Sequence, residues 1–438
     1  MKILVVTNLY PPHIVDPSDV RVETVCEAMK AHGHTVRVLT STGGAAKEYD
    51  DGRIARLLKL NGMYAAQCTT EVDELEQIEQ GNNNALHKLL TEFKPDVVHV
   101  FSLHGLGKSL LLQLIEADTP FALDINDPWL RAEVVTDPWL VYWNSDKVSF
   151  AKKMMRMGSS ITGGSRQIPT ALMRGKKPVK DFFHPDGKGQ NVGSMVIPRL
   201  YFGTSPLKYA ASHEGFTVDH AEIIPSAISA DKFNGAPLPA SETARKFLVV
   251  THLTPDSRIQ EVIDALAALL EAGHQAGLTI YGQGDSDFVA KLRNQILSSK
   301  IPVELRKVVN PALELPKIYR EHHAFIYPSA NAEPFVPAPL QAMACGLPVI
   351  INRAFELQEF YRHRENCLFF DSEDIGLLAG RMLELIQDGE SRYALAANGQ
   401  SEVLRAFDEA VMLENIETFL NHTSTYWEDH KSAVEGLV

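Results

Sequence analysis

Short apolar runs alternate with amphipathic segments along the whole chain. Residues 3–7 and 35–40 are continuous apolar or β-branched runs, and between them Val22, Val25 and Met29 recur at helical spacing. Continuous runs of this length are typical of strands buried in a parallel sheet, and the helical stripe indicates the helix that connects them. The repeated order of strand, helix and strand predicts an α/β fold with parallel sheets.

The same alternation divides the chain into two halves. Further strands are expected at 95–100, 121–125 and 160–163 in the first half, and at 246–252, 278–281, 325–327 and 348–351 in the second. Residues 181–215 are rich in Gly, Pro, His and aromatic residues, and we interpret them as an insertion. We predict a first domain over 1–234, a linker over 235–245 and a second domain over 246–421, followed by a terminal segment over 422–438.

Composition places the chain among globular proteins. Of 438 residues, 45% are hydrophobic and 22% are charged, and each half is long enough for a core of its own. Fifty-five acidic and 42 basic residues give a formal net charge of -13, which argues against a nucleic-acid partner or a polybasic membrane anchor. The four cysteines are scattered without metal-ligand spacing, as expected of reduced thiols. The opening MKILVV fits a first strand better than a signal peptide, so we expect a cytoplasmic protein.

The segment 327–351 carries the most specific chemistry. An apolar strand end is followed by a loop that contains Glu333, by a short helix with Pro339 in its first turn, and by Gly346, where the helix ends. Phosphates bind at helix N-termini at such a sheet edge, and a neighbouring carboxylate accepts hydrogen bonds from hydroxyls. A ligand with a phosphate end and a polyol end, such as a nucleotide sugar, suits both features.

This segment resembles the donor site of the retaining GT-B glycosyltransferases of family four. Glu333 matches the first Glu of the family's motif, residues 342–349 match its Ala-Met-Ala-x-Gly-x-Pro-Val run, and Gln341 stands where the family has a second Glu. The resemblance covers nearly the whole chain. It implies two Rossmann-like, doubly wound domains that face a cleft, with a C-terminal helix over 422–438 that crosses back to the first domain.

The resemblance also implies an activity. The family transfers a sugar from a nucleotide diphosphate to an acceptor hydroxyl, with retention of configuration, without a metal and without a separate cofactor. The first domain would bind the acceptor and the second the nucleotide sugar. The acceptor could be a glycan, as in polysaccharide biosynthesis, a lipid-linked sugar or a small molecule, and the protein a monomer or homodimer with or without a peripheral membrane contact.

Site residues follow from the matched positions. The resemblance gives Glu333, Asn126 and Asp127 as the catalytic residues. Glu333 would orient the donor sugar, Asn126 stands where many members have a His near the reacting carbon, and Asp127 would contact the sugar. The positions assigned to the donor are His252, Arg258, Gly282, Gly284, Phe335, Pro337 and Gln341, and those assigned to the acceptor are His13, His104 and Trp129. No metal site is expected.

Structural explanations compete with several of these roles. Asp127, Pro128 and Trp129 also fit a helix cap followed by a core Trp, and Arg258 also fits a solvated residue at a helix start. The family's Lys after the first strand of the second domain is replaced by Ser257. Several departures from the family's motif occur together, and they leave two other interpretations open. The second is a catalytically impaired GT-B protein that binds a glycan or a partner subunit. The third is a GT-B sugar-nucleotide epimerase.

Overall fold

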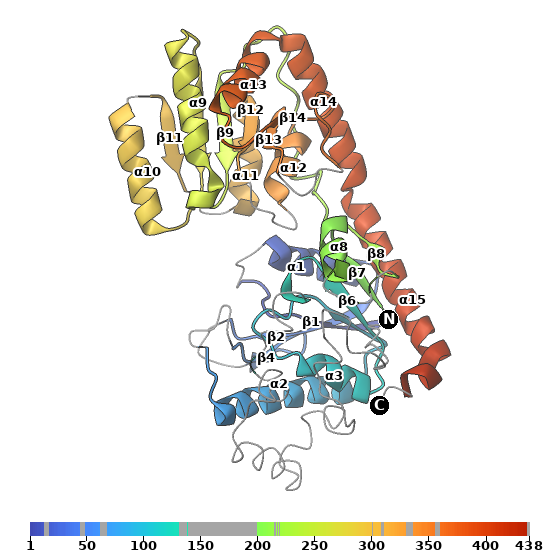
Figure 1. Cartoon of the computed structure of the whole chain (residues 1–438). Coiled ribbons are helices and arrows are strands. Elements are labelled where there is room, and N and C mark those ends of the chain that lie inside the picture. The colour runs from blue at the N-terminus through green and yellow to red at the C-terminus, as the bar shows by residue number, and fades with distance from the viewer. Residues whose placement is uncertain are drawn as a thin grey trace. The chain divides into compact units, whose positions relative to one another are not determined.

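A computed structural model gives the fold of the chain. It describes residues 1–12, 17–43, 49–61, 68–130, 138, 199–213, 216, 218, 220–299, 301–307, 311–329, 336–354 and 360–435. The chain folds into two compact units, each built on its own sheet (Figure 1). Unit 1 comprises Met1–Pro225 together with Leu413–Val438, and unit 2 comprises Ser226–Met412.

Unit 1 is built on an eight-stranded sheet. In spatial order its strands are β3 (Tyr49–Asp50), β4 (Ile54–Leu58), β2 (Thr35–Ser41), β1 (Lys2–Val6), β5 (Val97–Val100), β6 (Phe121–Ile125), β7 (Leu200–Phe202) and β8 (Glu222–Ile223). All neighbouring strands run parallel except the short β3, which pairs with β4 in the antiparallel sense. The strands predicted at 3–7, 35–40, 95–100 and 121–125 are therefore present, and the one predicted at 160–163 lies outside the described residues.

The segment predicted as an insertion, 181–215, contains part of this sheet. Within it, residues 200–202 form β7, which pairs with β6 and β8, and the helix α8 (Ser205–His213) follows. All three residues of β7 are fully buried, which explains why a run this short holds a place inside the sheet. The expectation of an insertion is wrong for this part.

Helices cover both faces of the unit 1 sheet. They are α1 (Pro17–Ala31), α2 (Val72–Phe93), α3 (Ser109–Glu116) and, at the C-terminus, α15 (Glu409–Glu435), besides α8. Figure 1 shows α2 and α3 side by side along one face, with α1 on the other. The far end of α15 is held by Trp427, whose ring lies 5.6 Å from that of Phe121 and whose indole N–H donates to Asp118 at 2.9 Å.

Unit 2 is built on a six-stranded sheet in which all strands run parallel. Their spatial order is β11 (Val303–Arg306), β10 (Gly277–Tyr281), β9 (Lys246–Val250), β12 (Ala324–Tyr327), β13 (Val349–Asn352) and β14 (Leu368–Phe370). Its helices are α9 (Ile259–Glu271), α10 (Ser286–Ser299), α11 (Pro311–Arg320), α12 (Pro337–Ala344), α13 (Ile375–Gln387) and α14 (Gly389–Ala406). The continuous apolar runs of the sequence thus correspond to strands buried on both faces, as predicted.

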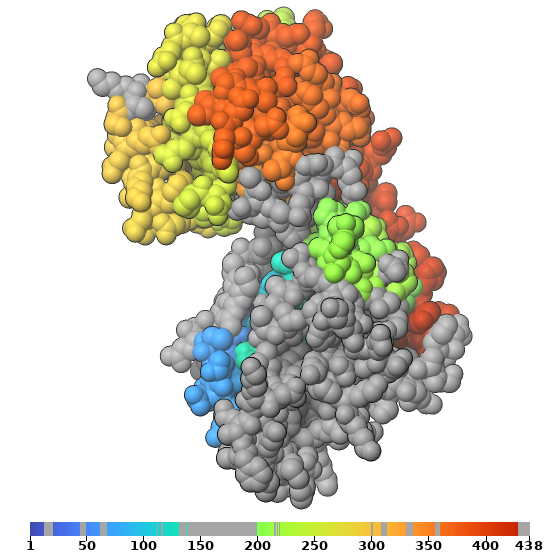
Figure 2. All heavy atoms as spheres, viewed as in Figure 1, coloured from blue at the N-terminus to red at the C-terminus, as the bar shows by residue number. Residues whose placement is uncertain are grey.

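Alternate strand residues build two separate cores on the two faces of the unit 2 sheet. Phe325 and Tyr327 belong to the core beneath α11 and α12, whereas Ala324 and Ile326 belong to the core beneath α9 and α13. The alternation follows from the two-residue period of a strand. The helices α9 and α13, which cover the face that carries Ala324 and Ile326, lie against each other in the space-filling view (Figure 2).

The segment predicted as an interdomain linker, 235–245, lies along unit 2. The buried guanidinium of Arg392 donates to the carbonyl oxygens of Pro239 at 2.8 Å and Glu242 at 2.7 Å. Gln400 donates to the carbonyl that opens the segment, at 2.9 Å. Buried carbonyl groups need such partners, so these side chains make the segment part of unit 2.

A search of the described helices for a membrane span found none with the length and hydrophobicity that a span requires.

Candidate functional site

Both sheets have a point at which the strand order reverses. In unit 1 this point lies between β1 and β5, and in unit 2 it lies between β9 and β12. Ligands of open α/β sheets bind outside the carboxyl ends of the strands at such points, where the loops leave in opposite directions and open a crevice. The two reversal points are therefore where a functional site is expected.

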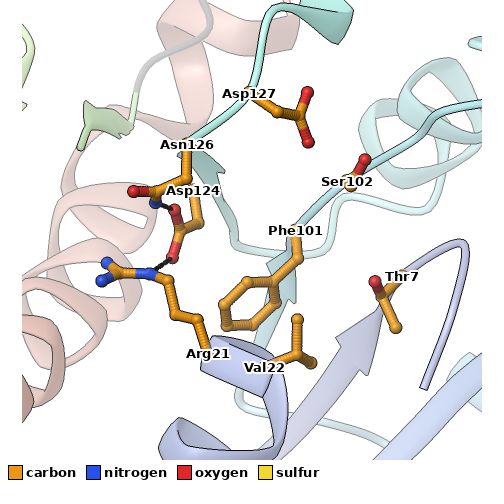
Figure 3. Close-up of a pocket in the computed structure, with 8 residues that line it drawn as sticks. All are labelled: Thr7, Arg21, Val22, Phe101, Ser102, Asp124, Asn126 and Asp127. Atoms are coloured by element: carbon orange, nitrogen blue, oxygen red, sulfur yellow. Dashed lines mark hydrogen bonds and ion pairs between the residues drawn. The ribbon is translucent and has the colours of Figure 1, made fainter. Parts of the chain in front are cut away.

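A small pocket occupies the reversal point of unit 1. Its lining comes from the ends of β1, β5 and β6 and from the first half of α1, and consists of Thr7, Arg21, Val22, Phe101, Ser102, Asp124, Asn126 and Asp127 (Figure 3). Asn126 and Asp127, which the sequence analysis assigned to catalysis, thus lie together in a pocket. Side chains at the ends of adjacent parallel strands converge in this way because the strands end at one edge of the sheet.

A chain of buried hydrogen bonds supports one wall of the pocket. The Nε of Arg21 donates to Oδ2 of Asp124 at 3.0 Å, and the hydroxyl of Tyr201 donates to the same oxygen at 2.7 Å. His99 Nε2 lies 2.9 Å from the Tyr201 hydroxyl oxygen, and its Nδ1 has no hydrogen-bond partner among the described residues. Because the tyrosine proton is given to Asp124, His99 is the donor in this bond and carries its proton on Nε2. Burial lowers the pKa of His99 to about 4, so the imidazole is neutral at neutral pH.

Asn126 is held in one orientation. Its side-chain amide donates to Oδ1 of Asp124, and its carbonyl oxygen packs against Gly203, where a Cβ atom would collide with it. The bonds of Arg21 and Tyr201 to the other oxygen of Asp124 therefore fix Asn126 indirectly. Figure 3 shows the chain of contacts from Arg21 through Asp124 to Asn126.

Asp127 faces a different side of the pocket. Figure 3 shows its carboxylate pointing away from Asn126, toward the side on which Ser102 lies. Its Oδ1 accepts the backbone N–H of Trp129 at 2.8 Å and lies 3.1 Å from Nε2 of His104. His104, predicted to contact an acceptor, is thereby placed directly behind a residue that lines the pocket. Asp127 both caps the helical turn that follows it and presents a carboxylate to the pocket.

Trp129 is not at the surface where the sequence analysis placed a sugar contact. Its side chain is fully buried in the unit 1 core. A ring without an exposed face cannot stack on a sugar. The competing explanation, a capping Asp followed by a core Trp, is the one that the structure shows.

Among the described residues at the reversal point of unit 2, Arg258 and His252 follow β9. Arg258 is the N-cap residue of α9, with φ 51°, and donates to Glu261 at 2.7 Å; Glu373 lies 3.7 Å from the same nitrogen. His252 is exposed in the loop before it. Arg258 is partly exposed, so its guanidinium can exchange these carboxylates for a ligand phosphate.

Gly282 and Gly284 follow β10 and pack against the loop after β9. Leu253 donates its N–H to Gln283 at 3.0 Å and accepts from Asp285 at 3.2 Å. A Cβ atom at Gly284 would collide with the Leu253 carbonyl, and one at Gly282 with the Thr251 carbonyl. Close approach of two backbones thus explains both glycines without a ligand.

Helix α12 begins at the same edge. Pro337 is its first residue, and Pro339 follows in the first turn. A helix has four N–H groups at its start without partners inside the helix, and each proline removes one of them. Gln341 accepts a hydrogen bond from the Tyr319 hydroxyl at 3.3 Å. Gly346 ends the helix with φ 78°, as predicted.

Several predicted site residues lie outside the described part of the chain, namely His13, Glu333 and Phe335. Sequence patterns alone did not point to Arg21, His99, Asp124 and Tyr201 as site residues. The apolar strand run that contains Asp124 was a usable signal, because a carboxylate inside a buried strand requires a partner. Among the described residues no cluster of His, Cys, Asp and Glu is arranged to hold a metal ion.

Comparison with known proteins gives a family match for unit 2. Residues 232–402 match the family model of glycosyl transferases group 1. An uncharacterized glycosyltransferase of Methanocaldococcus jannaschii is 24% identical over 414 residues, which cover 93% of this chain and 94% of the relative. The D-inositol 3-phosphate glycosyltransferase of Corynebacterium efficiens is 28% identical over 196 residues, 44% of this chain and 45% of the relative.

Solved structures with the same fold match nearly the whole chain. Sucrose-phosphate synthase from Thermosynechococcus elongatus has a TM-score of 0.64 at 15% identity, covering 96% of this chain and 99% of that chain. HepE of Anabaena in complex with UDP-glucose has a TM-score of 0.62 at 15% identity, covering 96% of this chain and 100% of that chain. The GT-B fold predicted from the sequence is confirmed, and the family match supports a glycosyltransferase.

Proposed function

We propose that the protein transfers a sugar from a nucleotide diphosphate to an acceptor hydroxyl, with retention of configuration and without a metal ion. The observation that carries the proposal is the family match over 232–402, which includes the reversal point of unit 2 and the start of α12. Unit 2 would bind the nucleotide sugar, and unit 1 the acceptor.

The leaving diphosphate requires positive charge at the end of the unit 2 sheet. Pro337 and Pro339 leave the start of α12 with fewer free N–H groups than an ordinary helix, although its dipole still favours an anion. The guanidinium of Arg258 would compensate for the missing N–H groups by supplying a positive charge. It holds Glu261 and Glu373 in the absence of ligand, and the diphosphate would replace the exposed Glu373 first.

The sugar requires hydroxyl contacts that hold the reacting carbon against the acceptor. In our proposal Glu333 orients the donor sugar from the loop before α12, and Gln341 holds the ribose. Tyr319 bonds the Gln341 side-chain oxygen, which leaves the amide N–H groups to donate to ribose hydroxyls. Holding both reactants in place is the main contribution expected of such a site.

Nucleotide-sugar turnover by the full chain tests this proposal. Wild-type protein should release nucleoside diphosphate from at least one sugar donor, with UDP-glucose the first to test because a structural neighbour binds it. Glu333→Gln should lower this rate roughly 100-fold or more, since a positioning contact at the reacting sugar is lost. Glu271→Gln, at the far end of α9, is the matched control and should retain the wild-type rate. An unchanged rate in Glu333→Gln would remove that residue from the mechanism.

A further inference from the structure

Three arginines and a histidine lie together at one end of the unit 2 sheet. The last strand in the order of that sheet is β14, and α13 packs against it (Figure 1). The histidine is His363, which precedes β14 and stacks on the ring of Phe369 with 5.9 Å between ring centres. The arginines are Arg353, after β13, Arg364, in the turn before β14, and Arg381, on α13. The reversal point of this sheet lies elsewhere, between β9 and β12.

The hydrogen bonds of His363 fix the position of its proton. Its Nδ1 lies 2.9 Å from the backbone nitrogen of Phe369, which can only donate, so Nδ1 accepts and carries no proton. The neutral imidazole therefore carries its proton on Nε2. Burial and the charges of the three arginines lower the pKa of His363, so the neutral form predominates at neutral pH. His363 thus presents an N–H donor at Nε2.

A second donor faces this N–H. Arg381 donates from Nε to the carbonyl oxygen of Phe369 at 3.0 Å and from Nη1 to Glu384 at 3.0 Å. Its Nη2 lies 3.2 Å from Nε2 of His363. A guanidinium nitrogen cannot accept a hydrogen bond, so neither group satisfies the other. Two donors at this distance repel each other until an oxygen accepts from both, and no described residue supplies that oxygen.

Both donors are held in place by other contacts. The two bonds of Arg381 to Phe369 and Glu384 fix the direction of Nη2, and the stacked ring of Phe369 together with its backbone N–H fixes the imidazole of His363. Groups that are already ordered lose little conformational freedom when they bind a ligand. The side chain of Arg381 is 16% exposed, so a ligand can reach it from solvent.

The charges at this point favour an anion over a neutral oxygen. One oxygen of Glu384 accepts both from Arg381, at 3.0 Å, and from Arg364, at 3.2 Å, so a single carboxylate serves two guanidinium groups. Guanidinium groups bind phosphate through strong, charge-assisted hydrogen bonds. The tetrahedral phosphate of a monoester has three terminal oxygens, which is enough for His363, Arg381 and the exposed Arg364.

We propose that His363 and Arg381 form a binding site for the phosphate group of a monoester. Its oxygens would accept from Nε2 of His363 and Nη2 of Arg381, with Arg364 as a further contact. The proposal is independent of the proposed function, since it concerns a different part of the unit 2 sheet. Soluble phosphate esters and the headgroup of phosphatidic acid both carry such a group, and the experiment separates these two sources.

Inorganic phosphate, titrated into the full chain at constant ionic strength, tests the site. Protein labelled with ¹³C-histidine gives a resonance for each imidazole, and the one missing in His363→Asn belongs to His363. The Asn oxygen can still accept from the Phe369 N–H, so this variant removes only the Nε2 donor. In wild type, phosphate should shift the His363 resonance until it saturates, and should raise the pKa of His363 because a bound anion favours the imidazolium.

Isothermal titration measures the contribution of each donor. Phosphate affinity should fall roughly tenfold or more in His363→Asn and in Arg381→Gln, since each loses a charge-assisted hydrogen bond. Arg293→Gln, with the same charge change at an exposed position of α10, should bind phosphate as wild type does. Glycerol 3-phosphate and vesicles that contain phosphatidic acid, tested on wild type and Arg381→Gln, identify the source of the phosphate group.

Three results would overturn the proposal. The first is a His363 resonance that does not respond to millimolar phosphate. The second is unchanged phosphate affinity in folded Arg381→Gln, which would show an adventitious ion only, bound elsewhere on the chain. The third is binding of inorganic phosphate without binding of either ester, which would exclude a monoester as the ligand.

Discussion

At the scale of single residues, the buried pair of Arg21 and Asp124 organises the unit 1 pocket. Taking two charges out of water costs several kcal/mol per ion, and hydrogen bonds to the remaining lone pairs and protons offset this cost. Asp124 uses both oxygens in this way, toward Arg21 and Tyr201 on one side and toward Asn126 on the other. The pair thereby fixes the side chain predicted to act at the reacting carbon.

The neutral imidazole of His99 makes this network sensitive to acid. Its pKa in the folded protein is about 4, below the ordinary value of 6.5, so the unfolded chain binds the extra proton first as the pH falls. His99 therefore contributes stability above pH 6.5 that is progressively lost toward pH 4, on the order of 3 kcal/mol in all. Chemical denaturation between pH 7 and 4.5 should show a shallower loss in His99→Gln than in wild type.

His87→Gln, on the exposed face of α2, is the matched control for that experiment and should follow the wild-type curve. If stability falls with pH as steeply in His99→Gln as in wild type, the acid sensitivity does not come from protonation of His99 in the unfolded chain.

Sequence reasoning found only part of this network. Asn126 and Asp127 follow a strand end directly, and that position alone predicts a site. Arg21, His99 and Tyr201 come from distant segments that only the folded sheet brings together, and no spacing in the sequence records their contact. Trp129 was assigned to a sugar because an indole suits both a ring face and a core, and burial decides between them.

At the scale of elements, the loops after β9 and β10 in unit 2 depend on two glycines. Since a Cβ atom at Gly284 would collide with the Leu253 carbonyl, Gly284→Ala should destabilise the protein by about 1–3 kcal/mol. Gly380→Ala, in an exposed and open position of α13, should instead be neutral or stabilising by up to about 1 kcal/mol. Thermal melts of both variants make the comparison. Equal melting temperatures would refute a packing role for Gly284.

Element prediction succeeded where apolar runs were continuous and failed where composition masked them. The unit 2 strands β9, β10, β12 and β13 were predicted because each is an isolated apolar run followed by polar or glycine residues. The strand β7 was missed because its three buried residues follow a stretch rich in glycine and polar residues. The Pro and Gly content of 235–245 gave no sign that Arg392 and Gln400 hold this segment on unit 2.

At the scale of the whole molecule, the proposed sugar transfer assigns a different role to each of the two doubly wound sheets. Unit 2 carries the family match and the basic residue for a diphosphate, and unit 1 carries a pocket with oxygens for hydroxyls. The positions at which the chain departs from the family's donor motif, Gln341 in particular, lower the expected donor affinity by one charge-assisted hydrogen bond, about 1–3 kcal/mol. In the proposed function, such a loss would weaken donor binding without abolishing the reaction.

Binding of nucleoside diphosphates to the full chain tests the central claim most directly. Isothermal titration with UDP, GDP and ADP should detect binding of at least one of them, with an affinity that falls roughly tenfold or more in Arg258→Gln and stays unchanged in Lys291→Gln, exposed on α10. Absence of heat with all three diphosphates at millimolar concentration, from protein shown to be folded, would contradict the account.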